Sequence, residues 1–528
     1  MKKIFYPLLF MLLSFSACTE DDSTLATLDV SDIVIENLEE EYSVRSYVGV
    51  NLKDVIKPTV QTAYAADDLT YTWYLFDATA VNIDYRDYLI STDKEPDYVV
   101  ELPSGDYRVV LEVRAQSNDF AQYASVLLHT STSYSQGFYI LKETPDGNTD
   151  LDCYNEELLT DVIAVGTGAP MKGKPCNLSI LYNGEYVDPG SNELAMDNFI
   201  HVTTESRDYK GFRSEDLTEV FNRDNLFFSG PMDDNEIPYG YFMAYFYQCY
   251  ISNTGIRSYG ATFSGEAEST GKLGYPSCAG GSKFVQIIGW TNGIMYWSNT
   301  EHRLMIADFN VSSSTVATDT SGEDIQSDYP TDLECLASGV NSTGGTNIGW
   351  FLCESPSKDE RYLIQSNSLG NAIERIVTLD PSLHLAKSDI VAANGRTASY
   401  IYCVDGNKLY AYSLTQGTEL EIPLTGIPAS ETVTFVTNQY LGFLGMISAT
   451  YNFDTFIVGT QEGYNYKLYF YEEEQMNGGQ PIAAPGLTLE GTGKVKSVRY
   501  LSPQKDITGS NLGFEEMMGN TNTFPFSD

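Results

Sequence analysis

Alternation of apolar and polar positions with a period of two residues is the main pattern along this chain. Within 69–76, one face carries the apolar and aromatic residues Leu69, Tyr71, Trp73 and Leu75. Within 107–113, apolar residues again fall at every second position, as Tyr107, Val109, Leu111 and Val113. Such alternation predicts half-buried strands. A core Trp followed later by Gly105-Asp106-Tyr107 is typical of an immunoglobulin-like sandwich, which we expect over 28–134.

After Gln136-Gly137 the pattern changes to a series of short paired strands. Apolar runs rich in Tyr, Ile, Val and Phe occur at 138–141, 284–290 with 294–297, 350–353 with 362–365, 400–404 with 409–414, and 456–458 with 468–471. Asn292-Gly293 and Asp405-Gly406 are dipeptides that join antiparallel strands in tight turns. The units start about 50 to 65 residues apart, which favours propeller blades.

The fold class predicted from these patterns is all-β. We expect the sandwich at 28–134 to be followed over 135–528 by a β-propeller-like domain of about seven blades. The competing arrangement replaces the propeller with two or three further β-sandwiches.

The first residues of the chain have the pattern of an export signal. Lys2 and Lys3 precede an apolar run at 4–13, and small residues lead to Cys18. The run is about half the roughly 20 residues that a membrane-spanning helix needs. We therefore expect a signal peptide at 1–17, lipidation at Cys18 and a polar tether over 18–27.

An acidic cluster follows the cysteine directly, as Thr19, Glu20, Asp21 and Asp22. It resembles the surface-export signal of Bacteroidetes lipoproteins. The resemblance implies a protein anchored by lipid at the outer membrane, on its extracellular face.

Charge and cysteine content narrow the possible partners. The chain has 31 Lys and Arg against 72 Asp and Glu, a formal net charge of −41, so nucleic acid is excluded as a partner.

Besides Cys18 the sequence holds seven cysteines, Cys153, Cys176, Cys249, Cys278, Cys335, Cys353 and Cys403. The number is odd, so at least one of them has no partner within the chain.

The layout as a whole resembles a known family. The signal, the sandwich and the stretch Gly137-Phe138-Tyr139-Ile140-Leu141-Lys142-Glu143, leading into 146–152, are similar to the PKD-like surface lipoproteins of Bacteroidetes. This resemblance implies an accessory role beside SusC/SusD-type outer-membrane transporters, which import glycans or peptides. It implies no catalytic residue.

Candidate chemistry is sparse. The four histidines have no His or Cys at metal-ligand spacing, and no Gly-x-Ser-x-Gly elbow, P-loop or dinucleotide fingerprint occurs. The only cofactor candidate is Ca²⁺, because positions one, three, five and twelve of one loop are occupied by Asp146, Asn148, Asp150 and Glu157. Leu151 stands where such a loop needs Gly, and the same run also predicts an ordinary hairpin turn.

Aromatic residues suggest a stacking surface for a ligand. Trp290 and Trp297 flank one predicted hairpin and are the first candidates for such a platform. Packing in the core or across strands is the competing interpretation, because antiparallel strands are generally rich in aromatic residues.

The sequence leaves three functions open. The first is a non-enzymatic accessory subunit of a SusC/SusD-type transporter that captures a glycan or peptide. The second is a surface hydrolase or lyase with a carboxylate site at the propeller centre. The third is an adhesin that uses the PKD-like domain as a stalk.

Overall fold

The computed structural model describes residues 32–503, apart from 245–246, 261–269, 288–293, 309–310, 344–345, 394–397 and 442–452. Its residues fall into two compact units. The smaller one holds most of the chain up to His129. The larger one holds everything from Thr130 onward, together with the short segments 43–48 and 101–105.

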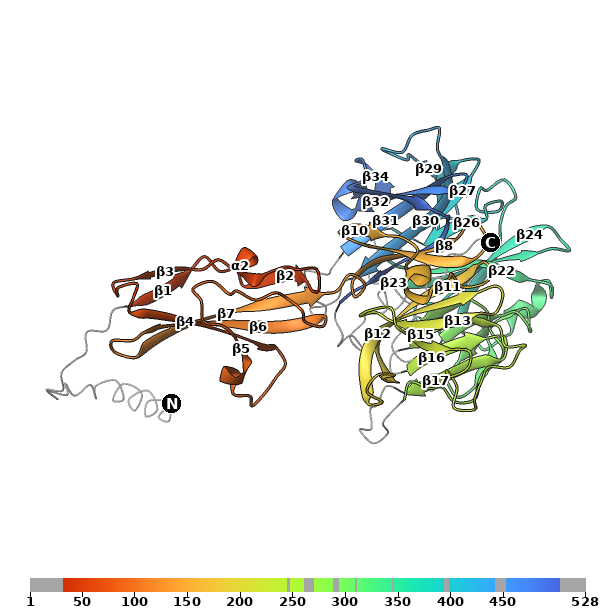
Figure 1. Cartoon of the computed structure of the whole chain (residues 1–528). Coiled ribbons are helices and arrows are strands. Elements are labelled where there is room, and N and C mark those ends of the chain that lie inside the picture. The colour runs from red at the N-terminus through yellow and green to blue at the C-terminus, as the bar shows by residue number, and fades with distance from the viewer. Residues whose placement is uncertain are drawn as a thin grey trace, which may run out of the picture. The chain divides into compact units, whose positions relative to one another are not determined.

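The smaller unit is built of antiparallel strands in a five-stranded sheet, of order β2-β7-β6-β4-β5, and a two-stranded pair β1-β3 (Figure 1). The strands are β1 (Ile33–Glu36), β2 (Glu41–Arg45), β3 (Thr59–Thr62), β4 (Leu69–Asp77), β5 (Leu89–Ser91), β6 (Gly105–Ala115) and β7 (Phe120–Ser131). The short helices are α2 (Leu52–Val55) and η1 (Tyr85–Tyr88).

The core of this unit follows the alternation in the sequence. Trp73 on β4 is fully buried, and its Nε1–H donates to the carbonyl of Asp93 at 3.1 Å. Val109, Leu111 and Val113 on the adjacent β6 are also buried. The predicted sandwich is confirmed, because the apolar residues of these neighbouring strands are buried in the core of the unit.

Among the described residues the larger unit contains seven antiparallel sheets of three or four strands and one two-stranded pair, so the predicted propeller is confirmed. We number the blades in chain order. Blade 1 contains β8 (Gly137–Glu143), β9 (Thr149–Asn155), β10 (Glu157–Leu159) and β36 (Lys494–Leu501). Blade 2 contains β11 (Pro175–Val187), β12 (Leu194–Thr204), β13 (Tyr209–Arg213) and β14 (Glu219–Asn222). Blade 3 contains β15 (Pro238–Ala244), β16 (Tyr247–Ser252) and β17 (Gly255–Gly260).

Blades 4 to 7 each have four strands. Blade 4 contains β18 (Val285–Ile287), β19 (Ile294–Ser298), β20 (Arg303–Ala307) and β21 (Ser314–Val316), and blade 5 contains β22 (Glu334–Thr343), β23 (Thr346–Ser355), β24 (Glu360–Ser366) and β25 (Ile373–Thr378). Blade 6 contains β26 (Ile390–Ala393), β27 (Tyr400–Asp405), β28 (Lys408–Ser413) and β29 (Glu419–Ile422). Blade 7 contains β30 (Thr432–Leu441), β31 (Phe453–Glu462), β32 (Asn465–Glu472) and β35 (Leu487–Thr492). The connections carry α3 (Val162–Thr167), η2 (Ile325–Asp328), η4 (Glu473–Gln475), β33 (Met476–Asn477) and β34 (Gln480–Pro481).

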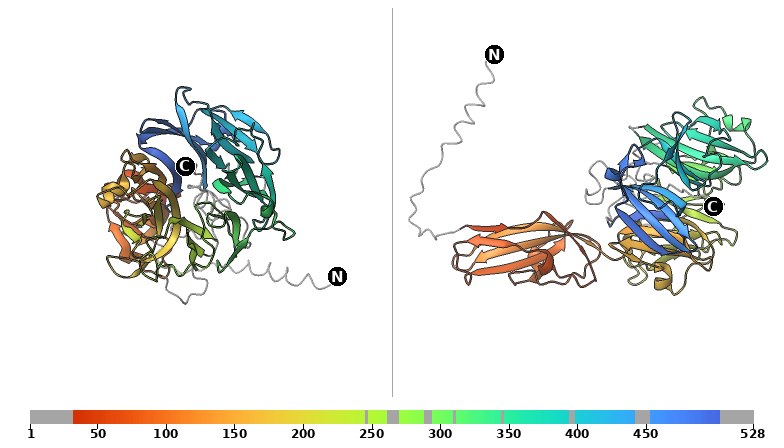
Figure 2. Two further views of the ribbon diagram at one scale, coloured as in Figure 1. Left: turned by 90° about the vertical axis from the view of Figure 1, so that its right-hand side faces the viewer. Right: turned by 90° about the horizontal axis from the view of Figure 1, so that it is seen from above.

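The ring closes by pairing the end of the chain with the start of the propeller. In blade 1, β36 runs antiparallel to β8, with Val498 opposite Ile140. The innermost strands β11 and β30 of the neighbouring blades both contact β36. Figures 1 and 2 show the seven sheets grouped around a common centre, with early and late strands side by side in blade 1.

A buried ionic cluster spans this closure. On blade 1, Lys142 Nζ lies 2.5 Å from Asp152 Oδ1. From β32 of blade 7, the hydroxyl of Tyr466 donates to Asp152 Oδ2 at 2.6 Å. Lys142 and Asp152 are almost wholly buried, and burial raises the pKa of Asp152 against the opposing effect of the ammonium group. The cluster thus joins the first and last blades through buried polar groups that compensate one another's charge and hydrogen-bonding capacity.

The hairpin of blade 6 shows how local sequence sets the turns. Asp405 pairs with Lys408, so Gly406 and Asn407 form the two-residue loop. Both have positive φ, 57° and 65°, as this type of hairpin turn requires. The other dipeptide, Asn292-Gly293, lies outside the described residues.

Candidate functional site

The larger unit contains a cavity of about 920 Å³, here called the mouth cavity. It lies at the end of the propeller where the innermost strands begin and the second strands finish. Blades 2 to 6 contribute its lining, which consists of Cys176, Thr204, Glu205, Ile237, Tyr239, Ser282, Lys283, Phe284, Trp297, Asn299, His302, Glu334, Cys335, Leu336, Glu354, Arg361, Lys387 and Asp389. This position on a propeller collects side chains that are distant in sequence.

One wall is held by Arg361, at the start of β24. Its Nε donates to Glu354 at 2.8 Å, and its terminal nitrogens donate to the carbonyl of Ser388 at 2.5 Å and to Asp389 at 2.8 Å. The Arg361 side chain is only 9% exposed. A planar guanidinium with several fixed acceptors is a rigid connector, so this residue ties blade 5 to the segment that enters blade 6.

The floor is aromatic and mostly inaccessible. Trp297 on β19 and Phe284 belong to one buried cluster between blades 4 and 5. The indole Nε1 of Trp297 has no hydrogen-bond acceptor among the described residues. A buried donor without an acceptor is unfavourable, and a polar ligand or a water molecule in the adjacent cavity would satisfy it.

Charged groups of both signs surround the cavity. The lining includes four acidic residues, Glu205, Glu334, Glu354 and Asp389, and three basic residues, Lys283, Arg361 and Lys387. His302 also lines the cavity, and its Nδ1 lies 3.0 Å from the carbonyl of Leu333. Such walls suit a polar ligand that carries charge or many hydroxyl and amide groups.

The described residues contain no group of three or more His, Cys, Asp or Glu side chains that could hold a metal ion. The four candidate calcium ligands are dispersed. Asp146 is exposed in the β8–β9 turn, while Asp150 is buried and accepts from the backbone N–H groups of Ile163 and Ala164. Glu157 is on β10 and pairs with Arg45.

The structure gives these candidate residues other local contacts. The segment 144–148 forms a hairpin turn in which the Thr144 N–H donates to the carbonyl of Asn148. The Asp150 carboxylate is already used at the start of α3, where unpaired N–H groups attract an anion. Residues of a true Ca²⁺ loop would instead point toward one centre.

Of the two tryptophans predicted to form a stacking platform, the structure describes Trp297. Trp297 is fully buried and contributes only to the cavity floor. Its burial agrees with the competing core-packing interpretation. Trp290 lies outside the described residues, as do Cys18, Thr19, Glu20, Asp21 and Asp22. Within the described residues, no helix combines the length and apolar character needed to cross a membrane.

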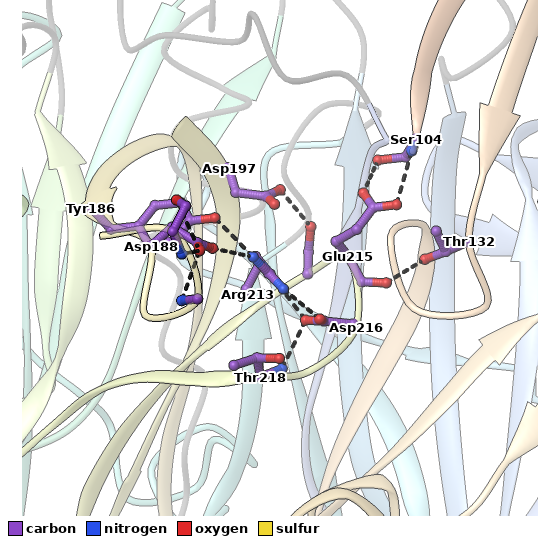
Figure 3. Close-up of polar contacts among 12 residues, drawn as sticks. Ser104, Thr132, Tyr186, Asp188, Asp197, Arg213, Glu215, Asp216 and Thr218 are labelled. Atoms are coloured by element: carbon purple, nitrogen blue, oxygen red, sulfur yellow. Dashed lines mark hydrogen bonds and ion pairs between the residues drawn. The ribbon is translucent and has the colours of Figure 1, made fainter. Parts of the chain in front are cut away.

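A second polar cluster lies on blade 2 and has a structural role (Figure 3). Arg213 donates to the hydroxyl of Tyr186 at 3.1 Å and to Asp188 at 2.8 Å, and it forms a two-pronged ion pair with Asp216. Hydrogen bonds from the backbone N–H groups of Ser191 and Gly190 lower the pKa of Asp188. These contacts fasten the β11–β12 loop to the turn after β13.

Sequence reasoning missed the mouth cavity for a physical reason. Its charged residues are isolated in the sequence, and no short motif marks residues such as Lys283, Glu334 or Lys387. Only their common position at the strand ends brings them together. Alignment of the blade repeats against one another could have revealed it, because the lining residues recur where the first strand of a blade begins.

A match to a known protein family covers the N-terminal part of the chain. Residues 18–175 match the PKD-like family. No curated protein matches the chain.

The solved structures that resemble the chain are remote. A quinonprotein alcohol dehydrogenase-like protein from Bacteroides thetaiotaomicron is 11% identical with a TM-score of 0.36, covering 88% of this chain and 97% of that one. The WD40 β-propeller domain of Doa1 is 12% identical with a TM-score of 0.34, covering 64% and 91%. AztD from Citrobacter koseri is 10% identical with a TM-score of 0.29, covering 81% and 100%. What the comparisons and the fold establish together is a PKD-like domain in a chain that continues as a seven-bladed β-propeller.

Proposed function

We propose that this protein is a lipid-anchored accessory subunit of a SusC/SusD-type outer-membrane transporter, exposed at the cell surface, and that it captures a glycan or peptide without transforming it. The observation that carries the capture role is the mouth cavity with its charged rim and aromatic floor. The anchoring rests on the N-terminal signal and Cys18.

The size and chemistry of the cavity support capture of a small polar ligand. Ligand pockets in proteins measure roughly 300 to 1,000 Å³, and this cavity of about 920 Å³ lies within that range. The wall is fixed by Arg361, so the site is largely preformed and loses little entropy when a ligand binds.

The partner is tested by purifying the tagged, lipidated protein from outer membranes in mild detergent and identifying what accompanies it by mass spectrometry. We expect stoichiometric recovery of a SusC/SusD-type pair. Recovery of the protein alone would contradict the accessory role and favour the adhesin or the hydrolase.

The cavity is tested by filling it. Leu336 is half-buried on the cavity wall, so a Trp side chain at this position should fill part of the cavity. When the purified complex is denatured, the Leu336→Trp variant should therefore release a smaller amount of bound small molecule than the wild type. Val165→Trp on α3 is the matched control, because Val165 is 72% exposed and does not line the cavity. Unchanged release from the Leu336 variant, with the complex intact, would show that capture occurs elsewhere.

A second candidate function is a hydrolase or lyase, favoured by the carboxylates of the mouth cavity. Glu334 and Glu354 lie opposite each other across β22 and β23. A glycosidase uses two such groups as acid and base or nucleophile. This alternative predicts turnover of a glycan or peptide by the wild type. Turnover should disappear in Glu334→Gln and persist in Glu421→Gln, since Glu421 on β29 is exposed and does not line the cavity.

A further inference from the structure

Two cysteines face each other across a pair of strands in blade 5. β22 and β23 are antiparallel, and Cys335 lies directly opposite Cys353 in their register. Directly opposed residues have Cβ atoms about 4.5 to 5.5 Å apart, and a disulfide needs about 3.5 to 4.5 Å. A small approach of the two strands therefore suffices to bond these sulfurs.

The backbone next to Cys335 is able to make that approach. The register shifts between Cys335 and Ala337, so Leu336 is the extra residue of a bulge. The Cys335 thiol donates to the carbonyl of Ala337 at 3.4 Å. A bulge increases local twist and interrupts the ladder, which permits a local shift without breaking the other strand pairs.

The other buried cysteines that lie on strands have different residues opposite them. Cys153 pairs with Tyr139 and Leu159, Cys249 with Phe242 and Ser258, and Cys403 with Val391 and Tyr410. Cys249 and Cys278 share one buried cluster, but Cys278 is on a connection and is not in register with Cys249. The pair in blade 5 is thus distinguished by its register.

We propose that Cys335 and Cys353 form an intramolecular disulfide in the exported protein. The oxidant is the disulfide of an exported thiol–disulfide oxidoreductase. One cysteine thiolate attacks that disulfide, forming a mixed disulfide and releasing one thiol of the oxidoreductase. The second thiolate then attacks the mixed disulfide, so the Cys335–Cys353 bond forms and the oxidoreductase leaves as a dithiol, which takes up the two protons that Cys335 and Cys353 gave up.

The bond forms during folding. Burial raises the pKa of the Cys335 thiol well above its usual range, and the neighbouring Cys353 thiol raises it further. A thiol held in its protonated form exchanges slowly. The two cysteines belong to one hairpin, which brings them together before the blade packs into the ring.

The crosslink has a consequence for the mouth cavity. Cys335 lines the cavity, and the next pair in the register places Glu334 opposite Glu354. Like charges directly opposite each other repel across a strand pair. A covalent bond one residue away holds these carboxylates at the cavity wall and replaces the thiol of Cys335 there.

The test uses the full-length protein from its native cells, denatured in acid and then alkylated with N-ethylmaleimide before digestion and mass spectrometry. We expect a peptide pair joined through Cys335 and Cys353, with Cys249 and Cys278 alkylated. Reductant should lower the thermal midpoint of the wild type by several degrees and leave that of Cys335→Ser unchanged.

Alkylation of Cys335 and Cys353 without reduction, or a bond from either one to another cysteine, would overturn the proposal. The mapping needs no variant, so a variant that does not fold leaves the test intact. Because the inference rests on the proposed export, surface digestion of the same cells with proteinase K is measured in parallel. Failure of export and failure of the disulfide therefore give separate results.

Discussion

At the residue scale, two groups of buried polar side chains stand out in the core of the propeller. Each is held by one or two specific partners, so its loss leaves a charge or a donor without compensation. Lys142, Asp152 and Tyr466 form one such group, and His201 with Tyr209 forms another.

Replacing Asp152 with Asn should destabilise the propeller by about 3 kcal/mol, because Lys142 then keeps only the more exposed Asp161 as a counter-charge. Urea unfolding at neutral pH measures this loss. The exposed pair Lys408–Glu421 is the matched control, and Glu421→Gln should cost less than about 1 kcal/mol. Equal effects of the two substitutions would contradict the role given to the buried cluster.

His201 should make stability depend on acid pH. It is fully buried on β12, its Nδ1 lies 2.8 Å from the hydroxyl of Tyr209, and burial lowers its pKa to about 3. In the unfolded chain a histidine has a pKa near 6.5, so between about pH 6.5 and 3 the unfolded state binds a proton that the folded state does not. Stability is therefore lost as the pH falls through this window.

Between pH 7 and pH 4.5 this term amounts to about 2.5 kcal/mol. Urea titrations of the wild type and of His201→Phe at both pH values measure this effect. The free energy of unfolding should fall by about 2.5 kcal/mol less in His201→Phe than in the wild type, whatever the stability of the variant at pH 7. A variant with the same decrease as the wild type would refute the assignment.

At the element scale, turn chemistry decides whether a strand pair forms. Gly406 has a φ of 57° in the β27–β28 turn, and an added Cβ there would meet no atom within 4 Å. The cost of a side chain at this position is therefore a backbone cost alone.

Gly406→Ala should destabilise by about 1 kcal/mol, since the left-handed region is unfavourable for Ala, although the unfolded chain also loses freedom. Gly166 in α3 is matched to it, with open space around its Cβ position and no positive φ. Gly166→Ala should be neutral or stabilising, because Ala favours a helix. Thermal unfolding of the two variants separates backbone strain from steric conflict.

At the scale of the whole molecule, the closure of the ring is the feature on which the propeller depends. Among the strands that the structure describes, the pairing of β36 with β8 joins the end of the propeller segment to its beginning within one sheet. Without it, the innermost strands of blades 2 and 7 lose their contact with this strand.

Val498→Pro should open this closure, because proline has no backbone N–H to offer the β36–β8 ladder and its ring fixes φ. Amide hydrogen exchange should accelerate across β8 and β30 in this variant. Val498→Ala removes only packing and should leave that exchange pattern close to the wild type. Protection of β8 that persists in the proline variant would show that the ring is closed by other contacts.

The sequence by itself determined the type of element and the general architecture. Alternation at positions such as Trp73 and Leu111 specifies one buried face per strand, and the Gly406-Asn407 pair specifies a tight turn, since both depend on neighbours within a few residues. Only the tertiary structure decided where functional groups meet. Lys283, Glu334 and Lys387 share the mouth cavity because the ring brings the strand ends of different blades together, while Asp150 and Glu157, close in sequence, are drawn to separate partners.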